Sequence, residues 1–198
     1  MNKPYSPACD NNRDPILSVI QPLLRESKAV LEIGSGTGQH AVYFAERLPQ
    51  LIWYTSDVIE NHAGIKQWLE EADISNIRPP AVLDVTQDRW PMLNIDAIFS
   101  ANTVHIMNWQ AVEKFFAGAG EALPKGGSFI LYGPFNYHNR YTSDSNARFD
   151  VWLKERDPES GIRNFEELDS LAEKAGFQLQ EDYAMPANNR ILYWEKIS

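Results

Sequence analysis

Short apolar runs alternate along the chain with stretches that carry a helical stripe. In those stretches apolar side chains recur at the spacing of an amphipathic helix, as at Ala41, Phe44, Ala45 and Leu48. The runs themselves are typical of strands buried on both faces of a sheet. This alternation predicts an α/β fold, a Rossmann-like doubly wound sheet of mostly parallel strands. The five runs cover residues 29–34, 51–57, 80–85, 95–101 and 128–133.

The two ends of the chain depart from this alternation. Residues 1–13 are polar and irregular, and Asp14 and Pro15 predict the N-cap and first residue of a helix. Residues 177–197 predict two strands joined by a turn at PANNR (186–190), which is an antiparallel hairpin. An ordinary dehydrogenase or flavodoxin-like domain would end on parallel strands instead. The hairpin therefore favours another branch of the Rossmann-like folds.

Length and composition indicate one domain. The chain has 198 residues, 43% of them hydrophobic, which is enough to bury a substantial core. Residues 134–160 are rich in polar and aromatic side chains and show little periodicity. A loop of that length is uncommon unless it works as a lid or a binding segment. We expect a single domain over residues 1–198, with residues 1–14 and 134–160 covering a substrate.

The charge is strongly acidic, with 27 acidic and 18 basic residues and a net charge of −9. Phosphate binding needs a positive surface, so we expect no nucleic-acid partner. The lone Cys9 excludes an internal disulfide. No apolar run reaches the roughly 18 residues of a membrane span, and the N-terminus lacks the apolar core of a signal peptide. We expect a cytoplasmic protein that contacts no membrane.

Several motifs of the chain resemble the class I S-adenosylmethionine-dependent methyltransferases. The resemblance implies the fold predicted above and S-adenosylmethionine as cofactor. The motifs are VLEIGSGTG (30–38), WYTSD ending at Asp57, LDVT (83–86), IDAIFSANTVHI (95–106) and LPKGGSFILYGPF (123–135). More narrowly, three further stretches resemble a methyltransferase-like family of unassigned substrate. They are SPACDNNRDPIL (6–17), DPESGIRNFEEL (157–168) and MPANN (185–189).

Three glycines, Gly34, Gly36 and Gly38, lie between a predicted strand and a predicted helix. Glycines at such a place permit a tight turn and let helix N-terminal amides face a ligand. The overlapping GTGQHA (36–41) also satisfies the dinucleotide-binding pattern. Glycine spacing alone therefore does not separate a methyl donor from NAD.

Three acidic residues at successive strand ends favour the methyl donor. Glu32 lies in an apolar strand, where an ionised carboxylate needs a partner such as the ammonium of a methionine moiety. Asp57 ends the second strand, and its two oxygens suit the hydroxyls of a ribose. Asp84 closes the third strand, where the resemblance implies a contact with the adenine amino group beside the backbone of Val85. A pyrophosphate near Glu32 would be repelled, which disfavours NAD.

Residues after the fourth strand are the candidates for chemistry. The resemblance implies that Asn102 lines the methionine portion of the cofactor. His105 should lie near the transferred methyl group as a candidate general base. In small-molecule O-methyltransferases, however, a histidine directly precedes an acidic residue and a tryptophan, whereas here Met107 occupies that place. Methyl transfer needs mainly in-line positioning, so a missing base is no objection. His62 is expected at the surface.

Substrate contacts are expected from the two covering segments. Arg13 is placed to pair with a carboxylate of the cofactor or substrate, or else with a surface acid. Tyr137 and Arg140 combine aromatic surface with hydrogen-bond donors, as the wall of a substrate pocket does. No metal site is predicted.

The leading hypothesis is a methyltransferase acting on O, N or S of a small molecule. One alternative is a non-catalytic module that binds the adenosyl ligand on the same fold. Another is an NAD-dependent oxidoreductase, which Glu32 and the terminal hairpin disfavour. A nucleic-acid methyltransferase is disfavoured by the acidic charge and by ANTV (101–104), where an Asn-Pro-Pro-Tyr signature would stand.

Overall fold

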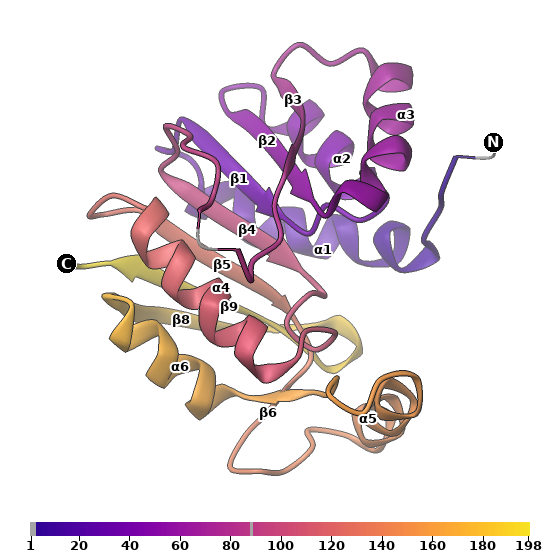
Figure 1. Cartoon of the computed structure of the whole chain (residues 1–198), viewed down its shortest axis with the longest axis vertical. Helices are drawn as coiled ribbons and strands as arrows, with labels where there is room; N and C mark the ends of the chain where they lie inside the picture. Colours follow the sequence, from indigo (N-terminus) through magenta and orange to yellow (C-terminus); the bar gives the residue numbers. More distant parts are fainter. Residues whose placement is uncertain (1–2, 88) are drawn as a thin grey trace.

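The structure is a computed structural model that describes residues 3–87 and 89–198. Its centre is a seven-stranded sheet in the order β3-β2-β1-β4-β5-β9-β8 (Figure 1). All neighbouring strands pair in parallel except β9, which is antiparallel to both β5 and β8. This confirms the predicted α/β fold with its antiparallel C-terminal hairpin. The strands are β1 (Ala29–Ile33), β2 (Ile52–Asp57), β3 (Ile77–Val82), β4 (Ala97–Ala101), β5 (Ser128–Gly133), β8 (Phe177–Met185) and β9 (Asn189–Lys196).

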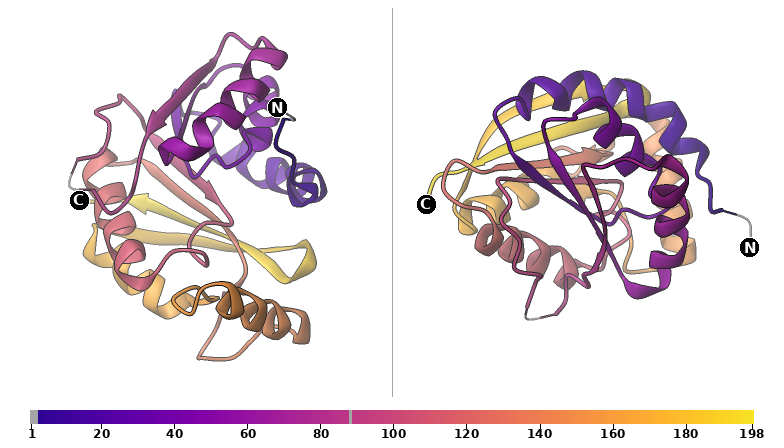
Figure 2. Two further views of the ribbon diagram at one scale, coloured as in Figure 1. Left: turned by 45° about the vertical axis from the view of Figure 1, so that its right-hand side comes forward. Right: turned by 90° about the horizontal axis from the view of Figure 1, so that it is seen from above.

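Helices cover both faces of this sheet, as the view from above in Figure 2 shows. One face carries α1 (Pro7–Leu23), α2 (Gln39–Arg47) and α3 (His62–Ala72), and the other carries α4 (Trp109–Ala122) and α6 (Phe165–Lys174). The remaining helix, α5 (Asp144–Arg156), lies at the edge to which the parallel strands point (Figure 1). No helix of the described residues is long and apolar enough to cross a bilayer. Short elements complete the chain: η1 (Ile59–Asn61), β6 (Phe135–Asn136), β7 (Arg163–Asn164) and η2 (Pro186–Asn188).

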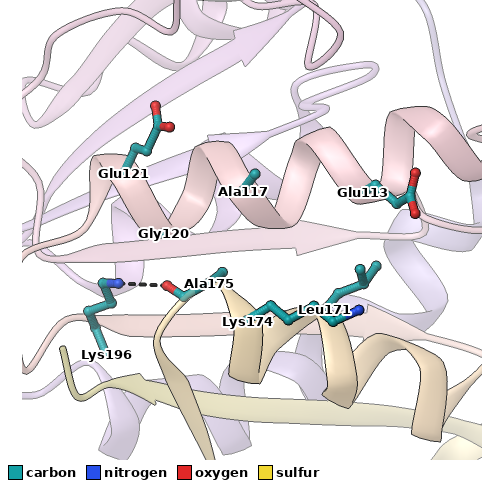
Figure 3. A pocket seen from close by; sticks show the side chains of 8 residues that line it. All are labelled: Glu113, Ala117, Gly120, Glu121, Leu171, Lys174, Ala175 and Lys196. Atoms are coloured by element: carbon teal, nitrogen blue, oxygen red, sulfur yellow. Dashed lines mark hydrogen bonds between the residues drawn. The ribbon is translucent and has the colours of Figure 1, made fainter.

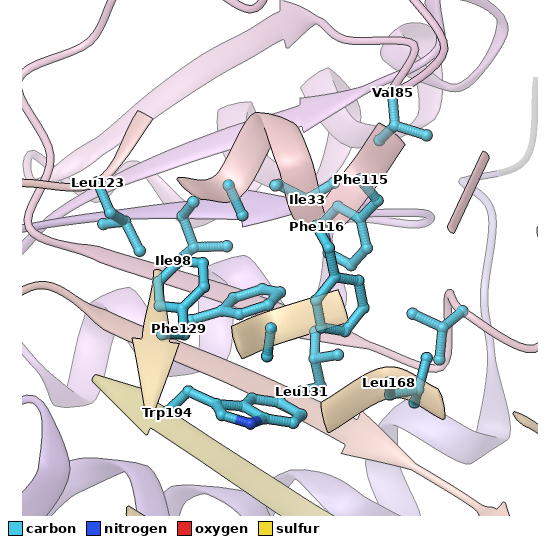
Figure 4. Packing of buried hydrophobic residues seen from close by; sticks show 14 of the residues in the cluster. Ile33, Val85, Ile98, Phe115, Phe116, Leu123, Phe129, Leu131, Leu168 and Trp194 are labelled. Carbon is cyan, nitrogen blue, oxygen red and sulfur yellow. The ribbon is translucent and has the colours of Figure 1, made fainter. Parts of the chain in front are cut away.

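Aromatic side chains fill the core beneath α4 and α6 (Figure 4). Phe129 of β5 lies at their centre, with ring centroids 5.2 Å from Phe116 and 5.6 Å from Trp194. On the opposite face, Phe44 of α2 packs 5.5 Å from Phe99 of β4. Both faces of the central strands are therefore buried, which explains their continuous apolar sequence.

The first helix begins earlier than the sequence predicted. Its N-cap is Ser6, not Asp14, and Pro7 is its first residue, a position that proline favours. Pro15 and Pro22 lie inside the helix, each removing one backbone hydrogen bond. The start of the helix is held against α2, because Ser6 N donates to Gln39 Oε1 at 2.6 Å.

The third strand is displaced toward the N-terminus, covering Ile77–Val82 instead of residues 80–85. It therefore contains Pro79 and Pro80, which would be excluded from a central strand. The strand lies at the edge of the sheet, where a missing amide hydrogen is tolerated. Asp84 therefore follows the strand instead of closing it.

The segment 134–160 is not a continuous irregular loop, because it contains α5. Ser143 caps this helix by accepting a hydrogen bond from Asn146 N at 3.1 Å. The helix buries only three residues, Asn146, Asp150 and Leu153. Two of the three are polar, so the helix leaves no apolar stripe in the sequence.

Candidate functional site

A cavity of about 740 Å³ opens at the carboxyl ends of the parallel strands. Its floor is the turn after β1, residues 34–37, together with Asn102 and His105 after β4. The first turns of α1 cover one side, and α5 covers the other. Both segments expected to cover a substrate thus contribute to its lining. In open α/β sheets this edge is where ligands bind.

The glycines shape the floor of the cavity through their backbone conformation. Gly34 and Gly36 have φ values of +73° and +57°, which side chains rarely adopt. A Cβ on Gly34 would also lie only 2.5 Å from Thr103 Cγ2. Gly38, with φ +89°, is the N-cap of α2 and starts the helix that follows the turn. The turn therefore brings the backbone of residues 34–37 close to the cavity, whereas Gly38 packs against α3, where a Cβ would lie 3.2 Å from Ile65 Cα.

Asp57 holds the glycine turn from beneath. Its Oδ2 accepts from Gly36 N at 2.7 Å, and its Oδ1 accepts from Val58 N and Asn61 Nδ2, both at 2.8 Å. A carboxylate accepts about four hydrogen bonds, so about one acceptor position remains on Oδ2. His62, expected at the surface, is buried, and its Nε2 lies 3.0 Å from Asp57 O. The imidazole therefore packs against the strand end, where it supports the position of Asp57.

Glu32 lies in the middle of the sheet and is 2% exposed. It pairs in register with Thr55 of β2 and Phe99 of β4. Its Oε2 accepts from Ser35 Oγ at 3.0 Å and from Trp53 Nε1 at 3.1 Å. Burial raises the pKa of Glu32 to about 7, and the two donors only partly offset that effect. Ser35 and Trp53 thus supply part of the hydrogen bonding that an ionised Glu32 needs.

Asp84 and Val85 lie beyond the end of β3 and outside the lining of the cavity. Asp84 Oδ1 accepts from Thr86 N at 2.9 Å and from Thr86 Oγ1 at 2.7 Å. These hydrogen bonds lower the pKa of the carboxyl. Val85 is buried in the apolar cluster beneath α4. The pair therefore forms a tight turn beside the sheet.

Asn102 and His105 converge on the floor of the cavity from the turn after β4. Asn102 has the left-handed φ of +59°, and its amide donates to Tyr132 O at 2.8 Å. A Cβ built on Gly133 would lie 3.8 Å from both Asn102 Oδ1 and His105 Nδ1. The two polar atoms therefore approach the same point of the β5 backbone.

His105 is a buried, neutral imidazole at the cavity wall. It is 4% exposed, and its ring meets that of Phe149 edge to face at 5.3 Å. Burial and, less strongly, the charge of Arg163 lower the pKa of His105 to about 4. Within the part of the chain that the structure describes, its Nδ1 is buried without a hydrogen-bond partner. A neutral ring with such an atom is able to accept a proton or a hydrogen bond.

Three residues expected to contact a substrate do not line the cavity. Arg13 pairs with Asp10, with Nη1 to Oδ1 at 2.7 Å. The Tyr137 hydroxyl donates to Asp182 Oδ2 at 2.6 Å, which directs it toward β8. Arg140 is exposed in the turn that follows β6. The structure therefore does not bring these three side chains together.

The wall of the cavity instead includes residues that sequence reasoning missed. Phe149, Trp152 and Arg156 line it from α5, and their spacing of three and four residues is itself a helical signal. On the opposite side, Asn12 of α1 places its Oδ1 2.6 Å from His40 Nε2, and both residues line the cavity. The burial of His40 lowers its pKa to about 4, so this ring is also neutral.

A second cavity, of about 420 Å³, lies between α4 and α6 (Figure 3). Ala117 and Leu171 form its apolar part, and Lys196 closes one end by donating to Ala175 O at 2.6 Å. None of the predicted site residues belongs to it. The candidate site is therefore the larger cavity at the carboxyl ends of the strands.

Comparisons with known proteins bear on this site. Residues 3–196 match the model of a family described as "Protein of unknown function (DUF938)". The fold is similar to that of the S-adenosylmethionine-dependent methyltransferase SibL in its apo form, with a TM-score of 0.82 and 20% identity over 96% of this chain and 56% of that one. Human N-acetylserotonin methyltransferase in complex with SAM gives 0.81 and 17%, over 96% and 53%. The mitomycin 7-O-methyltransferase MmcR gives 0.84 and 13%, over 96% and 54%. The chain thus spans little more than half the length of these methyltransferases and shares their fold.

Proposed function

The chain belongs to the family described as "Protein of unknown function (DUF938)", and we propose that it transfers a methyl group from S-adenosylmethionine to a small molecule. One observation carries the proposal. The glycine turn after β1 and the Asn102–His105 turn after β4 line a single cavity that α1 and α5 cover. A cofactor on the turn and an acceptor beneath α5 would then meet in one enclosed space.

The residues around the turn fit S-adenosylmethionine, which supplies an electrophilic methyl group when bound. Backbone at Gly34 and Gly36 leaves room for close approach to the ligand, and Gly38 is proposed to contribute as the N-cap of α2. Glu32 does not line the cavity, but its Oε2 accepts a hydrogen bond from Ser35 of the turn, which makes it a candidate partner for the methionine ammonium. Asn102 lines the cavity and is assigned to the same portion of the cofactor.

The nucleoside end is assigned to the two aspartates. Asp57 has about one free acceptor position, which suits one ribose hydroxyl. A second hydroxyl would require the Asn61 amide to turn away from Oδ1. Asp84, with the backbone of Val85, is assigned to the adenine, beyond the edge of the cavity.

Methyl transfer itself asks mainly that the acceptor be held in line with the methyl group. His105 is the candidate to receive the proton that an O, N or S acceptor loses as the new bond to carbon forms. Its unpartnered Nδ1 supports that role. Burial keeps the ring neutral, so one nitrogen carries a free lone pair, and the same burial makes the ring a weak base. Residues 1–14 and 134–160 are proposed to act as covering segments of the one domain. Slower proteolysis of both in the presence of S-adenosylhomocysteine would support that role, and unchanged cleavage would contradict it.

The partner is proposed to be a small molecule in the cytoplasm. The net charge of −9 disfavours a nucleic acid, and the single Cys9 suits a reducing compartment. Arg13, Tyr137 and Arg140 remain candidates for substrate contact only if the covering segments rearrange, because none of them lines the cavity.

Isothermal titration of the protein with S-adenosylhomocysteine and with NAD tests the proposal. We expect a Kd in the low-micromolar range or tighter for S-adenosylhomocysteine, about −7 to −9 kcal/mol, and no heat with NAD. Binding of NAD alone would instead support an oxidoreductase. Transfer of tritium from methyl-labelled cofactor to the small molecules of a desalted extract then separates an enzyme from a module that only binds.

A further inference from the structure

The candidate cavity differs from the rest of the molecule in its charge. Acidic residues number 27 of 198 in the chain, yet no Asp or Glu lines the cavity in the described residues. His40 and His105 also line it, and both are neutral at pH 7 because burial lowers their pKa to about 4. Arg156 is the permanently charged group among its lining residues. A positively charged acceptor would therefore find no counter-charge among the residues that line the cavity.

A row of aromatic rings leads from the floor of the cavity to that arginine. The Phe149 ring lies 5.3 Å from His105 and stacks on Trp152 at 5.7 Å with an interplanar angle of 18°. The Arg156 guanidinium carbon lies 4.6 Å from the Trp152 ring. Trp152 remains 46% exposed. Such a row offers stacking surface at one end and a cation at the other.

Arg156 has no acidic partner among residues 3–87 and 89–198. None of the ion pairs within residues 3–87 and 89–198 involves it. The buried carboxylate of α5, Asp150, is engaged on another side of the helix. It accepts from Tyr141 OH at 2.7 Å, Lys154 Nζ at 2.6 Å and Ile162 N at 2.7 Å. These contacts anchor α5 while leaving its aromatic side and its arginine toward the cavity.

We propose that the acceptor is a planar, conjugated compound with a carboxylate or another anionic group. Its plane packs against the exposed side of the Phe149–Trp152 pair, and its anionic group pairs with Arg156 at the rim. Its opposite end lies toward His105 and the turn after β4. This inference rests on the proposed function, because it assigns the acceptor side of that same cavity. It excludes amines that are cationic at neutral pH as acceptors.

Three naphthalenes that share one ring system and differ in the charge of their substituents test the charge preference by isothermal titration. They are 3-hydroxy-2-naphthoate, 2-naphthol and 2-(aminomethyl)naphthalene, which are anionic, neutral and cationic at pH 7. Each is titrated into the protein alone and into protein saturated with S-adenosylhomocysteine. We expect the naphthoate to bind about fivefold tighter than the naphthol, the scale of one partly exposed ion pair, and the cation to bind weakest.

Substitutions on α5 separate the cation from the rings. Arg156→Gln should make naphthoate and naphthol bind equally. Arg148→Gln, a matched charge change on the same helix at an exposed residue outside the cavity, should leave the difference intact. Trp152→Leu should weaken both ligands about fivefold and preserve their ratio.

Equal effects of the two arginine substitutions would overturn the inference, as would equal binding of naphthoate and naphthol or no binding at millimolar concentration. If S-adenosylhomocysteine binds and the charge preference is absent, only this inference fails. If the preference holds on the protein alone and S-adenosylhomocysteine does not bind, the methyltransferase proposal fails.

Discussion

Replacing Glu32 with glutamine should change how stability depends on pH. Burial raises the pKa of this carboxyl from 4.5 to about 7, which corresponds to a cost of about 3 kcal/mol for its ionised form in the folded protein. The folded protein holds the proton more tightly than the unfolded chain does. The stability from this group is therefore complete below pH 4.5 and is lost as the pH rises through 7.

The Glu32→Gln variant keeps the local hydrogen bonds, because one oxygen, Oε2, accepts from both Ser35 and Trp53. An amide carbonyl in the same place can accept both. The free energy of unfolding of the variant minus that of the wild type should therefore rise by about 3 kcal/mol between pH 4.5 and pH 8. The lowered pKa values of His40 and His105 act oppositely between pH 4 and 6.5, but they are common to both proteins and cancel.

Urea unfolding followed by far-ultraviolet circular dichroism at four pH values from 4.5 to 8 measures this difference. A difference that stays constant across the range would refute the burial argument for Glu32. The same group should couple to the cofactor if it pairs with the methionine ammonium. Only about a tenth of a group with pKa 7 is ionised at pH 6, against about nine-tenths at pH 8. S-adenosylhomocysteine should then bind about tenfold tighter at pH 8 in the wild type, and equally at both pH values in Glu32→Gln.

Three further outcomes are expected. Asp57→Asn should weaken S-adenosylhomocysteine by about 1–2 kcal/mol in calorimetry, because a ribose hydroxyl loses a charged acceptor; unchanged affinity would remove Asp57 from the site. Phe129→Ala should lower the free energy of unfolding by about 3–5 kcal/mol in urea titrations, since the ring is fully buried among aromatic neighbours, and a loss below about 1 kcal/mol would contradict that packing. If His105 accepts the proton, initial rates of methyl transfer should stay level from pH 8 to about 5, because its pKa is about 4; a fall centred near pH 6.5 would exclude the neutral, buried state.

The central strands could be predicted because burial on both faces leaves a continuous apolar run. β5 begins and ends where the sequence placed it, at Ser128 and Gly133. The bounds of the edge strand β3 could not be predicted, because the strand contains Pro79 and Pro80. Prolines are compatible with an edge strand but not with a central one, and the sequence does not say which of the two this strand is. Whether β3 is an edge strand depends on the strand order, which is set by contacts between residues far apart in the chain.

The candidate site divides in the same way. The glycine turn could be predicted because positions with a positive φ favour glycine, as at Gly34 and Gly36. The α5 wall could not, because that helix is held by the polar residue Asp150 and leaves Trp152 partly exposed. The composition of residues 134–160 made Tyr137 a candidate for substrate contact, but composition does not say where a side chain points. In the structure the hydroxyl of Tyr137 donates to Asp182 instead.

The two prolines of β3 also bear on how the protein behaves at high concentration. An outermost strand ordinarily presents free amide hydrogens, to which a strand of another molecule is able to add. Pro79 and Pro80 lack that hydrogen, and they lie where the pairing with β2 changes register between Tyr54 and Ser56. A second sheet would find no regular ladder there to extend. The two prolines that made β3 hard to recognise therefore also protect this edge of the sheet against edge-to-edge aggregation.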